Sequence, residues 1–230
     1  GWIPTLDKTV ADVPSKGNSQ GIFGFGFSPD TAITNLVSSV GVVSSDVTGV
    51  GTARQGGGAC EYGGDKGIFA YGRASGPNLS MSNLVSNAGV VASDVTGVGT
   101  ARRDMDACSY GEDKGIFGYG YPNTAVTNLV SNVGVVGTDV TGVGTARNNI
   151  SACEYGGDKG IFGYGYPNLS MTNLVSSSGV VATDVTGVGT GRTTLAACSY
   201  GGDKGIFGYG FVSGPGGQSI TNLVSNVGVV

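Results

Sequence analysis

The sequence has no histidine, a single tryptophan and few charged residues, which make up 12% of its 230 positions. Without histidine, a Ser-His-Asp triad, a Cys-His pair and a His-ligated zinc site are all excluded. No apolar run approaches the roughly 18 residues that cross a bilayer, so we expect no membrane insertion. The 12 Lys and Arg residues are scattered and the net charge is -4, so no basic stripe indicates nucleic-acid binding. We expect a protein that is not an enzyme.

Glycine is abundant instead, at 45 positions, and it recurs within an internal repeat. The segment DKGIF begins at Asp65, Asp113, Asp158 and Asp203, and a diverged copy, SQGIF, begins at Ser19. The spacings are 46, 48, 45 and 45 residues. Such periods indicate repeat architectures. We expect one domain over residues 1–230, with repeats near 19–64, 65–112, 113–157, 158–202, and 203–230 completed by 1–18.

Each repeat contains four segments typical of strands: ACEYGG, GIFGYG, TNLVSNVGVV and DVTGVGT. They are rich in Val, Thr and aromatic residues, with Gly, Asp and Pro between them, and none has sustained helical periodicity. Four short strands per repeat of this length are typical of a propeller blade. The sequence therefore predicts an all-β fold, a five-bladed β-propeller of four-stranded antiparallel blades.

The two ends of the sequence predict how the ring closes. The last copy stops at Val230 without its fourth segment, and residues 1–18 precede the first GIFGFG. We expect residues 3–13 to supply the outer strand of the last blade, so that the N-terminal strand closes the ring and no blade edge stays unpaired. The other interpretation is that the chain is a fragment of a longer array.

One stretch resembles a known repeat. Residues Gly191–Gly210, GRTTLAACSYGGDKGIFGYG, are similar to the kelch repeat, and DKGIFGYG and TNLVSNVGVV resemble the near-identical repeats of bacteriophage tail and fibre proteins. The resemblance extends from Gly17 to the end, with two departures: GYG replaces the double glycine of kelch, and the only tryptophan is Trp2. It implies a virion or extracellular location, with other virion proteins as partners and a possible homo-oligomer.

Two stretches vary between the repeats. Variation in length lies between GYG and the next TNLV, and variation in chemistry follows each repeated Arg, where the copies have QGGG, RDMD, NNIS and TTLA. In an up-and-down blade both stretches emerge on one face, opposite the nearly constant GGDKG turns. Because binding residues concentrate on loops held by a rigid scaffold, this variable face is the candidate binding surface. Neutral drift of unconstrained loops is the alternative.

Aromatic and amide side chains in these stretches are suited to sugars, through flat apolar surfaces and hydrogen bonds. We expect a non-catalytic recognition or structural module of a virion, such as a phage fibre, spike or decoration protein, that binds host-surface glycans. The alternative is an extracellular filament subunit that assembles through its faces. The repeated arginines have a second possible role, donation to loop carbonyls. The candidate ligand-binding residues are Tyr121, Asn123, Tyr166, Asn168, Phe211, Arg73, Asn78, Arg54, Arg102, Arg147 and Arg192.

The four cysteines, Cys60, Cys108, Cys153 and Cys198, occur once per repeat at equivalent positions. This spacing differs from the CxxC pairs of zinc and redox sites. We expect buried, reduced thiols that pack as small apolar groups, with no metal and no cofactor.

Overall fold

The computed structural model describes residues 18–230, and the predicted closing strand, residues 3–13, lies outside this range. The described part consists of strands, bridges and turns, which confirms an all-β fold. It contains no helix long and apolar enough to cross a membrane.

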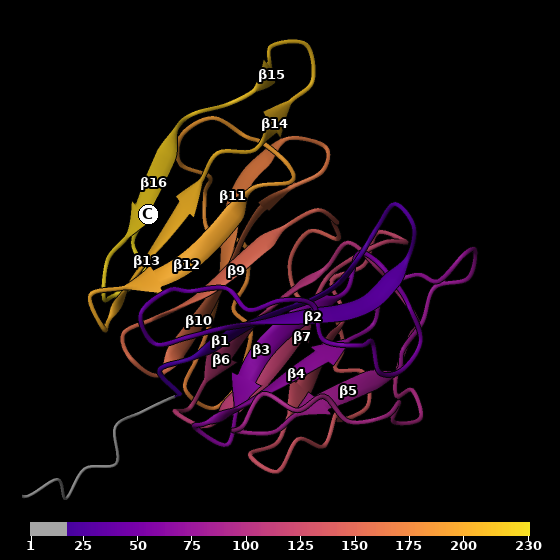
Figure 1. The fold of residues 1–230 in the computed structure, drawn as a ribbon. Coiled ribbons are helices and arrows are strands. Elements are labelled where there is room, and N and C mark those ends of the chain that lie inside the picture. Colours follow the sequence, from indigo (N-terminus) through magenta and orange to yellow (C-terminus); the bar gives the residue numbers. More distant parts are fainter. Residues whose placement is uncertain (1–17) are drawn as a thin grey trace, which may run out of the picture.

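Four of the repeats form three-stranded antiparallel sheets with the GIF segment in the middle (Figure 1). The first described repeat contributes a hairpin of two strands, and a short hairpin extends from the last sheet. The first hairpin is β1 (Gly21–Gly26) with β2 (Thr31–Val37). The sheets are β3 (Gly58–Tyr62), β4 (Lys66–Ala70) and β5 (Ser82–Val85); β6 (Asp106–Tyr110), β7 (Lys114–Gly118) and β8 (Thr127–Val130); β9 (Ser151–Tyr155), β10 (Lys159–Gly165) and β11 (Leu169–Val175); and β12 (Ala196–Tyr200), β13 (Lys204–Gly208) and β16 (Thr221–Val224). The short hairpin is β14 (Phe211–Val212) with β15 (Gly216–Gly217).

The fourth predicted strand of each repeat is present only as isolated bridges to the third strand. In the second repeat, Val95 bridges Ser82 and Val91 bridges Val85. The segment then lies close to the residues that precede the third strand: a Cβ added at Gly97 would lie 2.9 Å from the carbonyl carbon of Ser80. Beyond this point single main-chain bonds continue, such as Val98 N to Ser80 O at 3.3 Å, without forming a ladder. The described sheets therefore have two or three strands, and they do not form a closed ring of four-stranded blades.

The tyrosines of two GYG segments, Tyr119 and Tyr164, turn their rings out of their own sheets and toward the next repeat. Tyr164 has φ of 62°, and the pairing of β10 with β11 shifts register between Gly163 and Gly165, which marks a bulge. A bulge re-aims a side chain, and a left-handed tyrosine needs contacts that hold it. The Tyr164 hydroxyl donates to the Val188 carbonyl at 3.2 Å, and its ring is fully buried against Phe207 of the next repeat.

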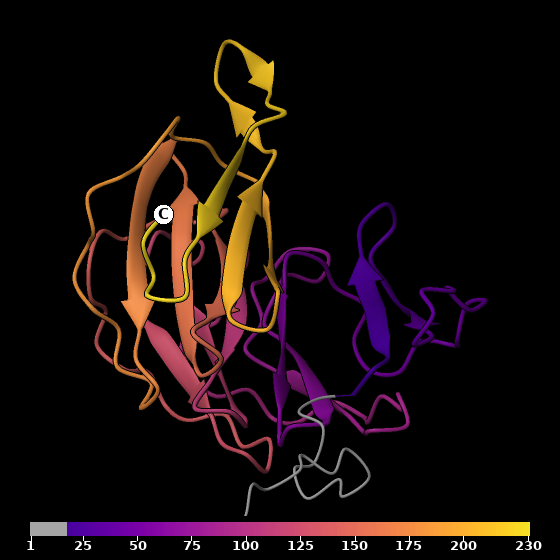
Figure 2. The same cartoon turned by 90° about the vertical axis from the view of Figure 1, so that its left-hand side faces the viewer.

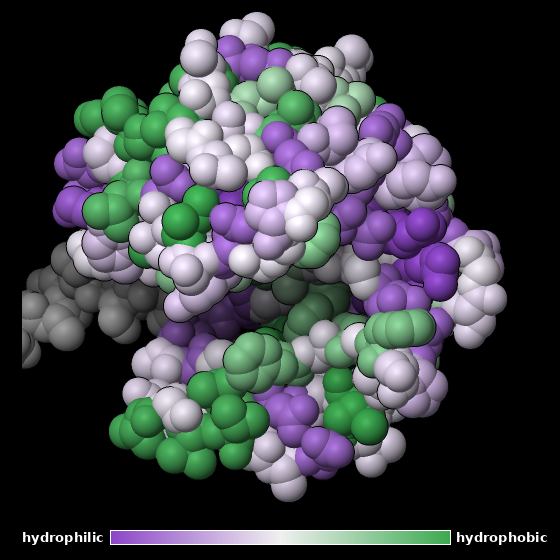
Figure 3. Space-filling model, turned by 90° about the horizontal axis from the view of Figure 1, so that it is seen from above, coloured by the Kyte–Doolittle hydropathy of each residue, from purple (hydrophilic) through white to green (hydrophobic). Residues whose placement is uncertain are grey.

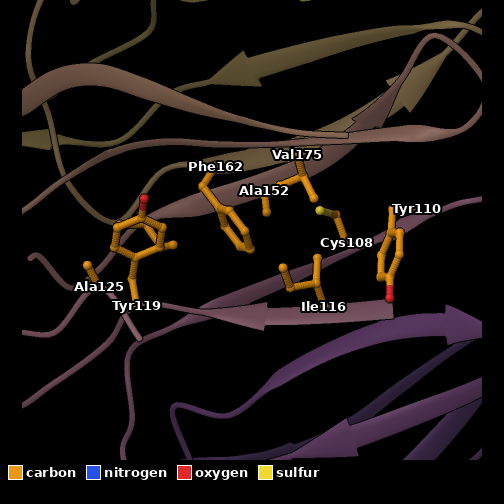
Figure 4. Close-up of a cluster of buried hydrophobic side chains, with 9 residues drawn as sticks. Cys108, Tyr110, Ile116, Tyr119, Ala125, Ala152, Phe162 and Val175 are labelled. Carbon is orange, nitrogen blue, oxygen red and sulfur yellow. The ribbon is translucent and has the colours of Figure 1, made fainter. Parts of the chain in front are cut away.

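Aromatic and aliphatic clusters between neighbouring sheets make up the core. Figure 4 shows one cluster, with Tyr119 and Phe162 side by side at one end and Cys108 and Tyr110 at the other. Each sheet is counted as one repeat from here on, so Cys108 and Tyr119 belong to the third repeat, with β6–β8, and Phe162 belongs to the fourth, with β9–β11. Equivalent clusters join the second repeat to the third and the fourth to the fifth. The core is therefore a series of similar junctions between neighbouring repeats.

The repeats follow a curved path, so the first and the fifth repeats lie on the two sides of a gap. Figure 2 shows the β1–β2 hairpin across a gap from the last sheet, with the other sheets curving between them. The variable loops leave one end of the middle strands and the DKG turns begin the other end. These two ends define a variable face and a constant face.

Candidate ligand-binding face

The two variable stretches of each repeat meet on the variable face, as the sequence predicted. One bridge partner is the residue directly after each repeated Arg. The other is the residue directly after the next GYG segment in the chain, or after AYG in the second repeat. In the third repeat, Arg103 N donates to Tyr121 O at 3.1 Å and Tyr121 N donates to Arg103 O at 2.6 Å. Only main-chain atoms make these bonds, so the bridge does not itself use the side chains of the two residues. The bridged pairs are Gln55 with Arg73, Arg103 with Tyr121, Asn148 with Tyr166 and Thr193 with Phe211.

Three candidate aromatic side chains occupy equivalent places on this face. Tyr121 is 44% exposed, Tyr166 51% and Phe211 46%. The Arg103 guanidinium lies 4.3 Å from the centroid of the Tyr121 ring, so one ring face of Tyr121 is covered by a cation. The structure thus places a partly exposed aromatic side chain in each of three consecutive repeats.

Amide side chains lie close to two of these aromatic residues and link neighbouring repeats. Asn78 donates to Tyr121 O at 3.1 Å, and its own amide oxygen accepts from Arg103 at 3.0 Å. Asn123, which is exposed, accepts a hydrogen bond from Asn148. Each of these bonds crosses from one repeat to the next. The arrangement holds Asn78 and Asn123 close to the aromatic side chains.

Two further candidates lie at the edge of this group with buried polar atoms that have no partner among the described residues. These atoms are Arg73 Nε and Asn168 Oδ1. Both residues are half-buried, and Asn168 has φ of 70° in the loop after Tyr166.

The four repeated arginines lie beneath the face. Arg54 is 1% exposed and Arg102, Arg147 and Arg192 are fully buried. Arg147 Nε donates to Tyr164 O at 2.7 Å, and its terminal nitrogens donate to Thr145 O at 3.0 Å and Asn173 Oδ1 at 2.8 Å. Its guanidinium also stacks on Tyr119 at 4.2 Å. Donation to loop carbonyls, one of the two predicted roles, is confirmed.

Burial lowers the pKa of Arg54, Arg102 and Arg147, and nearby groups offset part of this effect. The Asp184 carboxylate lies 4.0 Å from Arg147 and accepts hydrogen bonds from Thr145 and Asn173. Asp139 occupies the same place with Thr100 and Asn128. Each carboxylate thus ties its own repeat to the preceding one.

The cysteine prediction is confirmed in part. Cys108 and Cys153 are buried, and burial raises the pKa of both thiols. Cys60 is half-buried, and the prediction is wrong for Cys198, which is exposed. The reason is positional: Cys108 and Cys153 pack against a glycine of the following repeat, whereas β12 has no such cover in the described structure. The described residues contain no cluster of three or more His, Cys, Asp or Glu that could hold a metal ion.

Sequence reasoning did not single out Arg103, Asn148 and Asp106. Arg103 and Asn148 stand first in the variable stretches RDMD and NNIS, which was the available signal. Asp106 lies on β6, and its carboxylate accepts from Ala107 N at 2.9 Å and Ala152 N at 2.8 Å. Burial raises the pKa of Asp106 to about 7, although both hydrogen bonds oppose the shift.

The comparisons with known proteins add no relative. No family model matches the sequence, and no curated protein matches it either.

Proposed function

We propose that the protein is a non-catalytic recognition module that binds host-surface glycans through its variable face. The observation that supports this is the set of Tyr121, Tyr166 and Phe211, each partly exposed on a main-chain bridge. Asn78 bonds Tyr121, and Asn123 bonds Asn148, the bridge partner of Tyr166. Aromatic rings stack on the apolar faces of sugars, and amides pair with hydroxyl groups. The resemblance to phage tail and fibre repeats supports a virion or extracellular setting.

The proposal includes a finer fold: a ring of five blades, completed by pairing of residues 3–13 with the segment that ends at Val230. The recurrence of one type of junction between successive repeats supports this ring, because equal junctions generate a regular curve.

A glycan array with paired variants tests the function. We expect Tyr121→Ala combined with Tyr166→Ala to weaken glycan binding by about 2 kcal/mol, since aromatic anchors carry large shares of binding energy. The melting temperature should stay nearly unchanged, because both residues hold their loops through main-chain bonds.

The matched control is Lys66→Ala combined with Lys159→Ala on the constant face, where each lysine pairs with the preceding aspartate. This variant should bind normally. Loss of binding in the lysine variant, with normal binding in the tyrosine variant, would place the functional surface on the other face.

A filament subunit is the second candidate, and exposed valines favour it. Val90, Val135, Val180 and Val229 are each 63% to 65% exposed at equivalent places. They follow turns that lie beside the DKG turns of the constant face, as the bond between Asn87 and Asp65 shows for the second repeat. Repeated apolar exposure is typical of interaction surfaces. Electron microscopy of the purified chain would show filaments, and Val135→Asp with Val180→Asp should dissolve them.

A further inference from the structure

A recurring set of contacts joins each described repeat to the next, and aromatic pairs are its first member. A ring from one GYG or GFG segment packs edge-on against the Phe of the next GIF segment at every described junction. The pairs and their centroid distances are Phe25–Phe69 at 5.2 Å, Tyr71–Phe117 at 5.5 Å, Tyr119–Phe162 at 5.3 Å and Tyr164–Phe207 at 5.2 Å.

The second contact is made by the thiols. A Cβ added at Gly160 would lie 2.5 Å from Cys108 Sγ, and one added at Gly205 would lie 2.6 Å from Cys153 Sγ. Each glycine therefore accommodates the thiol of the preceding repeat. Gly21 is the equivalent glycine of the first described repeat.

The third contact places a Tyr and a Leu of one repeat against a turn glycine of the next. A Cβ added at Gly228 would lie 2.9 Å from side-chain atoms of both Tyr155 and Leu174. Tyr110 and Leu129 lie in the same way against Gly179. Gly41 is the equivalent turn glycine of the first described repeat.

On the fifth and first repeats, the residues equivalent to these contact partners are exposed. On the fifth, Tyr209 is 64% exposed, Leu223 58% and Tyr200 39%, although their equivalents Tyr164 and Tyr155 are buried. On the first repeat, Phe23 is 63% exposed. These side chains have the same identities as the partners at the other junctions, except that Phe25 replaces the tyrosine at the first, and they differ in being uncovered.

We propose that the exposed face of β12, β13 and β16 binds the β1–β2 hairpin of the same chain. Phe23 then packs on Tyr209, Gly21 accommodates Cys198, and Gly41 lies against Tyr200 and Leu223. This surface is separate from the proposed glycan site.

The curvature of the array favours the chain's own hairpin over a second copy. Figure 2 shows the hairpin across a gap from the last sheet, and Figure 3 shows the surface hollowed between two parts of the molecule. Two surfaces tethered in one molecule meet at an effective concentration of about 1 mM, far above that of a second chain at micromolar concentration.

Disulfide trapping tests the contact through Cys198. The variant is Gly21→Cys in a Cys60→Ala background, because Cys60 and Gly21 line the same cavity. Under mild oxidation we expect a bond between the introduced thiol and Cys198 within one chain. It should form faster than in the control Ile33→Cys, which places a thiol on the same hairpin away from the junction. Circular dichroism confirms that each variant folds.

Non-reducing gels and peptide mass spectrometry separate the outcomes. An intrachain bond that is lost on Cys198→Ser supports the proposal. Disulfide-linked dimers overturn it in favour of a second copy, and a yield no greater than that of Ile33→Cys overturns it outright. Glycan binding is measured separately, so failure of either proposal leaves the other to be judged on its own data.

Discussion

At the scale of single residues, the buried arginines are the most demanding groups in the molecule. Arg147 has no exposed surface, and its charge is balanced by two carbonyls, an amide and a tyrosine ring, with Asp184 nearby. Hydrogen bonds to charged groups are stronger than neutral ones, and removing the donor leaves buried acceptors unpaired.

We therefore expect Arg147→Ala to lower the free energy of unfolding by about 3 kcal/mol, measured by urea denaturation. Arg103→Ala is the matched control on the variable face, where the side chain is 25% exposed, and should cost about 1 kcal/mol or less. Equal losses in the two variants would contradict a structural role for the buried set.

Asp106 gives a pH-dependent contribution. Its pKa is raised from 3.8 to about 7 by burial. Between these values the native state holds a proton that the unfolded chain has lost, so this group makes stability fall as pH rises through the window. Below pH 3.8, Asp106 is protonated in both the native and the unfolded state, so it no longer makes stability depend on pH.

Asp106→Asn should remove this slope, so its stability relative to the original chain should increase from pH 4 to pH 7 in denaturant titrations. Asp139→Asn is the contrasting variant. Burial alone would raise the pKa of Asp139, but hydrogen bonds from Thr100 and Asn128 outweigh it and lower the pKa. The stabilising contribution of Asp139 is therefore lost as the pH falls through its lowered pKa. If stability depended on pH in the same way in Asp106→Asn and Asp139→Asn, the opposite pKa shifts of the two carboxylates would be refuted.

At the scale of elements, close approach of neighbouring repeats depends on glycine in the middle strands. A Cβ at Gly160 would overlap Cys108 Sγ, which is buried and cannot move aside. Overpacking of a core costs about 1 to 3 kcal/mol. We expect Gly160→Ala to destabilise the protein by this amount, and Cys108→Ala to relieve much of the loss in the double variant. Gly217→Ala, where no atom lies within 4 Å of the added Cβ, is the control for a glycine outside the junctions.

The sequence was a good guide to three of the strands and a poor guide to the fourth. ACEY, GIFG and TNLV have β-forming residues that pair in the predicted order. DVTGVGT is also rich in Val and Thr, yet it makes only isolated bridges and single main-chain bonds. Gly97 brings it against the backbone of Ser80, a close approach that no propensity encodes. For the candidate site, loop variation identified the face, but it did not reveal that Arg103 covers Tyr121, because that contact depends on register between two distant loops.

At the scale of the whole molecule, the proposed closure changes what the last repeat contributes to stability. Leu129 packs against the cluster of the next junction, whereas Leu223, its equivalent in the fifth repeat, is 58% exposed. If β1–β2 covers the last sheet, Leu223→Ala should cost about 2 kcal/mol in urea denaturation, the loss also expected for Leu129→Ala. Val180→Ala, at an exposed valine, should change stability by no more than about 0.5 kcal/mol. A silent Leu223→Ala beside a costly Leu129→Ala would show that the face stays uncovered in solution.

The main-chain bridges of the variable face have a consequence for how such a protein can change its specificity. Because Arg103 and Tyr121 are joined through backbone atoms alone, the bridge imposes no demand on side-chain identity, and Gln55 with Arg73 or Thr193 with Phe211 satisfies the same geometry. The bridge itself therefore tolerates point mutations at these two positions. Where the side chain also bonds the preceding repeat, as Arg103 does with Asn78 and Asn148 with Asn123, selection for a new ligand must act on two neighbouring repeats together.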